Sequence, residues 1–162
     1  MAKKKSWREK LQGNPDLPSI KELYNDSEPP RLTGWMVIPS PSEVYEIMRQ
    51  VPEGKLITAL EIRSILARRH GADLACPMTT GLFIGIAAQA AEEAASEGES
   101  DTAPYWRTLK SGGILNEKYP GGVEEQRRRL EGEGHRVVAR GKHLGVLDYE
   151  ESLLDEDQLE NR

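Results

Sequence analysis

The 162-residue sequence contains a single cysteine, only three histidines and no long hydrophobic run. One thiol, Cys76, excludes an internal disulfide framework and a zinc site built from several cysteines. The histidines (His70, His135 and His143) have no close cysteine or histidine partner, so we expect no metal site and no cofactor. No stretch approaches the roughly 18 apolar residues of a membrane helix, and no apolar core follows the basic start of the chain. We therefore expect no membrane association, no secretory signal and a cytoplasmic location.

Charge is distributed unevenly, although the length is typical of one domain with flanks. The net charge is -5, yet residues 148–162 carry seven acids against one arginine, and residues 92–101 carry five acids and no base. The remainder is therefore net positive. Clustered Lys and Arg attract a polyanion such as DNA, whereas mixed charge also serves simply to keep a protein in solution. Charge alone favours the second interpretation, because the chain as a whole is acidic.

The two ends of the chain have little hydrophobic periodicity. Residues 1–34 mix Lys, Asp, Pro and Ser, which indicates an extended arm with one short helix around Ile20–Tyr24. Trp7 and Trp35 are the expected anchor points of this arm on the body. The end of the chain is rich in acids and is expected to be mobile. The predicted segments are an N-terminal arm, a folded domain and an acidic tail, at residues 1–34, 35–147 and 148–162.

Helical patterns dominate the middle of the chain. Apolar residues at i, i+3, i+4 and i+7 from Val44 to Val51 predict a helix with a start signal at Ser40 or Ser42 and an end at Pro52. Thr58 and Glu61 fit a capping box, which starts a helix that should end near His70. After Pro77, a second helix is expected to begin at Thr79 or Thr80 and to continue to Ala95, and its first half is apolar on nearly every side.

The order of the later elements points to a fold class. An extended segment, PYWRTLK, precedes a helix over Val123–Glu131 and a hairpin in which ARGK separates HRVV from HLGVL. Helix, turn and helix, followed by an extended segment and a glycine-rich turn, are typical of a winged helix-turn-helix, in which the second helix enters a DNA groove. The sequence therefore predicts an α+β, mainly α, domain.

Two runs of the sequence carry a family resemblance. VPEGKLITALEI at 51–62 and PYWRTLKSGGILNEKYPGGVEEQRRRLEGEG at 104–134 resemble the DNA-binding domain of the O6-alkylguanine-DNA alkyltransferases and the alkyltransferase-like proteins. The resemblance covers roughly residues 41–147 in matching order. It implies the winged helix-turn-helix fold of the C-terminal domain of the alkyltransferases.

The resemblance also implies that this chain is not an enzyme. The alkyltransferases transfer an alkyl group to the Cys of a Pro-Cys-His-Arg segment, where this chain has Pro104, Tyr105, Trp106 and Arg107. Tyr105 replaces the acceptor, and a phenol with a pKa near 10 is no substitute for a thiolate. The two rings either wall a pocket and stack on an everted base or fill the gap left by the missing Cys-His pair. The predicted pocket residues are Tyr105, Trp106, Ala59 and Pro104.

The resemblance places the helix that reads DNA after Pro77. An arginine that replaces the everted base in the family aligns with Gly81 or Leu82, and no Lys or Arg lies between Arg69 and Arg107. Small residues still permit approach to a minor groove, and Leu82 or Phe83 could enter the base stack, although such residues are more often core. The predicted DNA-binding residues are Thr79, Thr80, Gly81, Leu82, Gly85, Arg107, Lys110, Arg127, Arg128 and Arg129.

Two functions follow from these observations. The first is a non-catalytic alkyltransferase-like protein that binds DNA and recognises alkylated or otherwise damaged bases in repair. The second is an interaction module that keeps the fold and binds a protein or a small planar ligand without binding DNA; the cation-free helix favours it. Two further points stay open: Arg107 could serve a structural hydrogen bond instead of a phosphate, and Cys76 could be a displaced nucleophile, although an inert thiol is more common.

Overall fold

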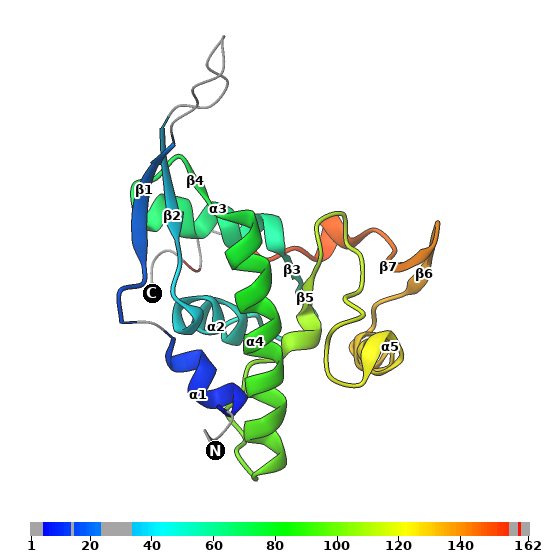
Figure 1. Ribbon diagram of the computed structural model, residues 1–162. Helices are drawn as coiled ribbons and strands as arrows, with labels where there is room; N and C mark the ends of the chain where they lie inside the picture. The colour runs from blue at the N-terminus through cyan, green and yellow to red at the C-terminus, as the bar shows by residue number, and fades with distance from the viewer. Residues whose placement is uncertain (1–4, 14, 24–33, 156–158, 160–162) are drawn as a thin grey trace.

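Three helices enclose the main hydrophobic core of the computed structural model, which describes residues 5–13, 15–23, 34–155 and 159 (Figure 1). They are α2 (Pro41–Arg49), α3 (Ala59–Arg69) and α4 (Pro77–Ser96). The longest, α4, runs from beside β4 (Leu74–Ala75) to α1 (Trp7–Gln12), against which it packs. Each helix contributes apolar side chains to the core, among them Val44, Ile47, Met48, Ile62, Ile65, Leu66, Phe83, Ile84 and Ala87.

Local capping explains where these helices begin. The capping box of α3 is confirmed, because the Glu61 carboxylate accepts from the Thr58 amide at 2.8 Å while Thr58 caps the helix. The start expected for the next helix at Thr79 or Thr80 is wrong. Helix α4 begins at Pro77 with Cys76 as its N-cap, because a proline fits the first helical position, whose amide would have no helical partner.

The N-terminal residues form a strand where a helix was expected. Strand β1 (Ser19–Leu23) pairs antiparallel with β2 (Gly34–Ile38), and β4 pairs parallel with the other edge of β2. The short helix expected around Ile20–Tyr24 is therefore wrong for the described residues, and Tyr24 lies outside them. Pairing with β2 satisfies backbone groups that a short isolated helix would leave to water.

The two tryptophans expected to anchor the arm are both partly exposed. The Trp7 amide donates to the Glu93 carboxylate of α4 at 3.2 Å, and the Trp35 amide donates to Asp73 at 2.8 Å. The recorded polar contacts to the body thus come from the main chain of these residues and not from their indoles.

A second, smaller core lies on the side of α4 away from β1 and β2 (Figure 1). Its elements are β3 (Ile57–Thr58), the 3-10 helix η1 (Tyr105–Arg107), β5 (Thr108–Leu109), α5 (Gly122–Gly132), β6 (Val137–Arg140) and β7 (His143–Val146). The helix predicted over Val123–Glu131 and the hairpin predicted after it are confirmed, as α5 and as the β6–β7 pair. The hairpin turn is shorter than ARGK, because Ala139 and Arg140 pair with Leu144 and His143. The segment PYWRTLK is extended only in part, since it begins with η1.

The C-terminal residues pack on the body instead of forming a mobile tail. The 3-10 helix η2 (Tyr149–Ser152) precedes Leu154, which is buried and donates its amide to the Leu56 carbonyl at 2.8 Å. Leu159 is also buried, and Arg69 donates to its carbonyl. The expectation of mobility is therefore wrong for residues 148–155 and 159; the other tail residues lie outside the described part of the chain.

The α+β, mainly α, fold class predicted from the sequence is confirmed. The division into arm, domain and tail stays a prediction. Within the residues that the structure describes, no helix is both long and apolar enough to cross a lipid bilayer.

Candidate nucleic-acid interface

A cavity of about 460 Å³ lies against the N-terminal half of α4. Its opposite wall is the segment that follows β5, and the first turn of α3 contributes to its edge. This size falls within the range of small-molecule sites. Residues that line it include Ala59, Gly81, Leu82, Gly85, Lys110, Lys118 and Tyr119.

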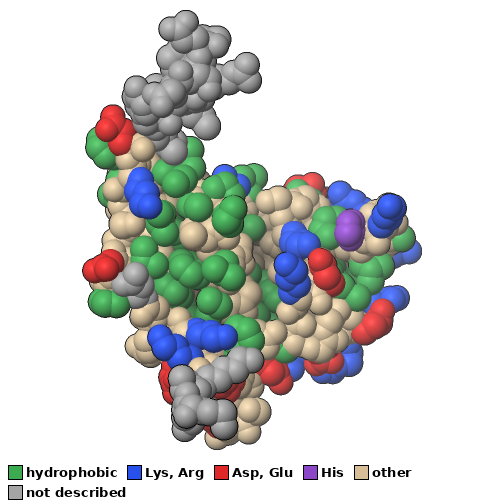
Figure 2. Space-filling view, in the orientation of Figure 1, with side chains coloured by type: hydrophobic (Ala, Val, Ile, Leu, Met, Phe, Trp, Pro, Cys, Tyr) green, Lys and Arg blue, Asp and Glu red, His purple; other side chains and the backbone are tan. Residues whose placement is uncertain are grey.

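Three exposed apolar side chains stand beside this cavity and are called here the apolar ridge: Leu60, Met78 and Leu82. Met78 is 82% exposed and Leu82 is 59% exposed, whereas the next residue, Phe83, is 8% exposed. The expectation that Leu82 and Phe83 both belong to the core is therefore confirmed only for Phe83. Successive residues of a helix point about 100° apart, so one faces out while the other faces in. Figure 2 shows hydrophobic side chains gathered over this part of α4.

The glycines of α4 are not required by packing within the chain. A Cβ atom added at Gly81 or Gly85 would meet no heavy atom within 4 Å. Glycine in a helix interior also costs about 0.5–1 kcal/mol relative to alanine. Their effect is to leave the helix backbone open to close approach from outside, next to the exposed Leu82.

Tyr105, at the position that resembles the acceptor site, is buried and neutral. Its side chain is 2% exposed, and its ring meets those of Trp106 and Tyr119 edge to face, with centroids 5.4 Å apart in each pair. The hydroxyl donates to the Glu92 carboxylate at 3.2 Å. Burial, together with the Glu92 charge, raises the pKa of Tyr105 to about 12. A phenol in this state carries no nucleophilic charge at neutral pH.

Trp106 contacts two charged side chains. Its indole N–H donates to Glu133 at 2.8 Å, and the Arg129 guanidinium lies over the ring, 4.4 Å from its centroid. Tyr105 is thus buried and Trp106 half-buried, and the choice between the two interpretations of these rings stays a prediction.

The four predicted pocket residues do not line one cavity. Ala59 lines the cavity beside α4, whereas Tyr105 borders a separate, acidic hollow with Glu92 and Glu125. Pro104 is buried.

Tyr119 joins these two regions and was not identified from the sequence. Its ring contacts Tyr105 and lines the cavity beside α4, and its hydroxyl donates to the Thr108 carbonyl at 2.8 Å. Its sequence context, directly before Pro120 and two glycines, indicated only a turn, so no local signal marked it as a cavity residue.

Arg107 makes structural hydrogen bonds within the protein, which was the alternative to a phosphate contact. Its guanidinium pairs with Glu133 at 2.8 Å and donates to the Val51 carbonyl at 2.8 Å. Burial alone would raise the pKa of Glu133, but hydrogen bonds from Arg107, Trp106 and the Gly54 amide outweigh it and hold that pKa below its ordinary value. Arg107 therefore faces a buried carboxylate.

The other predicted phosphate contacts also have carboxylate partners. Lys110 pairs with Glu117 at 3.2 Å. On α5, Arg127 pairs with Glu131, and Arg128 and Arg129 both pair with Glu125. These helix pairs stabilise the exposed face of α5, and they reduce the net positive charge that this face could offer to DNA.

The first turn of α4 differs from residue to residue. Thr80 is fully buried, so it cannot reach a duplex as the chain stands, while Thr79 is half-buried.

Cys76 is half-buried at the N-cap. Burial there opposes ionisation, but hydrogen bonds from Thr79 and Met78 and the charge of Arg63 together lower the pKa of the thiol. Its assignment as inert stays a prediction.

Comparisons with known proteins give structural similarity only. No family model and no curated protein matches the chain. A crystal structure of Schizosaccharomyces pombe Atl1 in complex with damaged DNA containing O6-carboxymethylguanine is similar with a TM-score of 0.46 and 23% identity over 71% of this chain and 94% of that chain. A structure of S. pombe ATL in complex with DNA gives 0.45 and 22% over the same shares. The likeness to Atl1 concerns the fold alone.

Proposed function

We propose that this chain binds duplex DNA without chemical reaction and recognises an altered base that has left the stack. The observation that carries the proposal is the apolar ridge beside the open cavity of α4. An apolar side chain such as Leu82 can enter a base step from the minor groove. The adjacent cavity then offers room for the displaced base.

The surroundings of the ridge support this docking. Gly81 and Gly85 leave the helix backbone open, so that a sugar–phosphate chain can approach it closely. The Tyr119 ring, which is itself buried, forms part of the floor of the cavity. Lys118 stands on the far wall, beside the Lys110–Glu117 ion pair, and brings positive charge to the rim.

The same structure argues against alkyl transfer. The side chain at the acceptor position, Tyr105, is buried, and its pKa is raised to about 12 by burial first and by Glu92 second. The function proposed is therefore recognition of a lesion, with repair left to other proteins.

Fluorescence anisotropy tests the proposal directly. The full chain is titrated into a labelled duplex that carries O6-methylguanine and into its unmodified counterpart, at low and at physiological salt. We expect binding that weakens with salt and favours the modified duplex. Leu82→Asp should abolish the preference, whereas Leu147→Asp, also at an exposed leucine, is the matched control and should not. Absence of binding at low salt would overturn the proposal.

The interaction module remains the second candidate. It is favoured by the absence of Lys and Arg from the sequence between Arg69 and Arg107, so that α4 itself brings no cation to its exposed face. An apolar surface without charge is also suited to a protein or a planar ligand. A chain that binds no duplex at low salt, but whose ridge is protected from solvent by a partner, would fit this second function.

A further inference from the structure

The apolar ridge lies between two hollows. One is the cavity described above. The other, of about 290 Å³, lies between α3 and β4 and is lined by residues that include Leu60, Arg63 and Ala75. Ala59 borders the first hollow and Leu60 the second, so the first turn of α3 separates them. Each hollow has two cations on its wall, Arg63 and Arg68 in one and Lys110 and Lys118 in the other, although α4 itself has none.

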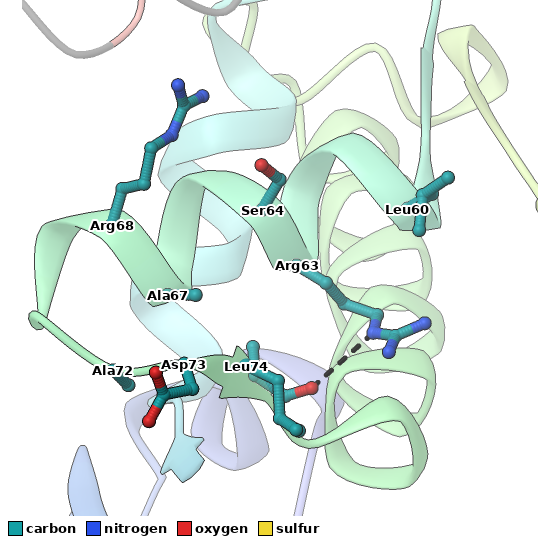
Figure 3. Close-up of a pocket in the computed structure, with 9 residues that line it drawn as sticks. Leu60, Arg63, Ser64, Ala67, Arg68, Ala72, Asp73 and Leu74 are labelled. Carbon is teal, nitrogen blue, oxygen red and sulfur yellow. Dashed lines mark hydrogen bonds between the residues drawn. The ribbon is translucent and has the colours of Figure 1, made fainter. Parts of the chain in front are cut away.

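Arg63 has no carboxylate within ion-pairing distance in the part of the chain that the structure describes. Its recorded contact is a long hydrogen bond from Nε to the Ala75 carbonyl, at 3.4 Å. Figure 3 shows its side chain extending from α3 toward the residues that precede α4, while the nearby Asp73 points the other way. Asp73 accepts from the Trp35 amide. Arg63 thus lies near the ridge and meets no acidic partner among residues 5–13, 15–23, 34–155 and 159.

Lys118 occupies the corresponding place on the other side. It is exposed on the wall of the larger cavity, and no ion pair of its ammonium is recorded among the described residues. Its neighbours differ, because Lys110 and Glu117 pair with each other at 3.2 Å. Within the described part of the chain, Lys118 thus differs from Lys110, which has a carboxylate partner.

Resting on the proposed function, we infer that Arg63 and Lys118 are the phosphate contacts that hold the two strands of the duplex on either side of the apolar ridge. A ridge that enters a groove has one sugar–phosphate backbone on each flank. Phosphate contacts position a protein on DNA and account for most of the salt dependence of its binding. A cation on each flank meets this requirement, whereas the arginines of α5 are already paired with acids of their own helix.

The salt dependence of binding measures these contacts. The association constant for an unmodified duplex is determined from about 50 to 200 mM salt for the full chain and for Arg63→Gln, Lys118→Gln and the double variant. The slope of log K against log salt is negative. Each single change should make it shallower by about 0.9, and the double change by about twice that amount. Arg49→Gln, at an arginine that pairs with Glu46 on α2, is the matched control and should leave the slope unchanged. Arg63→Lys retains the charge and should also retain the slope.

The outcomes separate this inference from the proposed function. A wild-type chain that binds with a steep slope, together with Arg63→Gln and Lys118→Gln variants that keep that slope, would overturn the two contacts but leave DNA binding in place. A wild-type chain that binds no duplex would overturn both. Circular dichroism melting of each variant establishes that it is folded; should Arg63→Gln unfold, Arg63→Ala and Lys118→Gln keep the test decisive.

Discussion

Arg107 and Glu133 form an ion pair that ties η1 to the residue following α5, with 2.8 Å between guanidinium and carboxylate. Both side chains are largely buried, at 14% and 8% exposed. Glu133 also accepts from the Trp106 indole and the Gly54 amide, so one carboxylate joins three segments distant in sequence. Because such a carboxylate is costly to leave unpaired, this network sets the position of the Tyr105–Trp106 segment.

Removal of this carboxylate should strongly destabilise the fold. Glu133→Ala leaves the Arg107 guanidinium buried and unpaired, and we expect the free energy of unfolding to fall by about 3 kcal/mol. Glu131→Ala, which breaks the exposed pair with Arg127, is the matched control and should change it by no more than about 0.5 kcal/mol. Urea denaturation measures both. Equal losses in the two variants would contradict the structural role of Glu133.

The same network predicts a dependence of stability on pH. The folded pKa of Glu133 lies below its ordinary value of 4.5, so its contribution to stability is present above that value and is lost as the pH falls through the lowered pKa. Wild type should therefore lose more stability on acidification than Glu133→Gln, whose side chain does not titrate. Urea midpoints at neutral and at acidic pH provide the measurement. Parallel losses in both proteins would show that other carboxylates account for the acid sensitivity.

Tyr105 predicts a loss of stability at alkaline pH. Burial, with the Glu92 charge adding to it, raises the pKa of Tyr105 from 10.0 to about 12. The stabilisation is complete below pH 10 and is lost as the pH rises through the raised value. Tyr105→Phe should therefore reduce the drop in unfolding free energy between these two pH values. Urea denaturation at pH 10 and at pH 12 measures the drop, and an equal drop in wild type and Tyr105→Phe would contradict the role of Tyr105.

Gly81→Ala should separate stability from binding. An added methyl group meets no atom of the chain, and alanine favours a helix interior, so we expect stabilisation by about 0.5–1 kcal/mol. The same methyl group would stand on the exposed face of α4 and weaken duplex binding. Thermal melting and anisotropy give the two values. Unchanged affinity with increased stability would place the DNA contact elsewhere.

Intact-mass spectrometry should detect no covalent transfer. The full chain incubated with a duplex containing O6-methylguanine should keep its mass, because Tyr105 is buried and neutral and supplies no thiolate. The Cys76→Ala variant serves as control for the single thiol of the chain. A mass increase of one methyl group in wild type that is absent from Cys76→Ala would identify Cys76 as an acceptor and refute the non-catalytic assignment.

Several elements could be predicted because their signals are local. The capping box of Thr58 and Glu61 requires only residues three apart, and the helix of α5 and the β6–β7 hairpin follow from periodicity and turn residues. The absence of a cysteine from the segment Pro104–Arg107 is likewise evident from the sequence alone. These features depend on contacts between neighbours along the chain.

The tertiary structure decided the features that depend on distant contacts. Strand β1 exists because β2 offers it a partner, and Leu154 is buried because the Leu56 segment binds its amide. The sequence by itself placed Leu82 and Phe83 in a helix, but only packing determined that Phe83 enters the core while Leu82 points outward. The sequence also showed which residues are cations. Only the fold determined that Arg107 pairs with Glu133 and that Arg63 meets no acid among the described residues. The reason is that charge pairing depends on distances in space, which the linear order of residues does not contain.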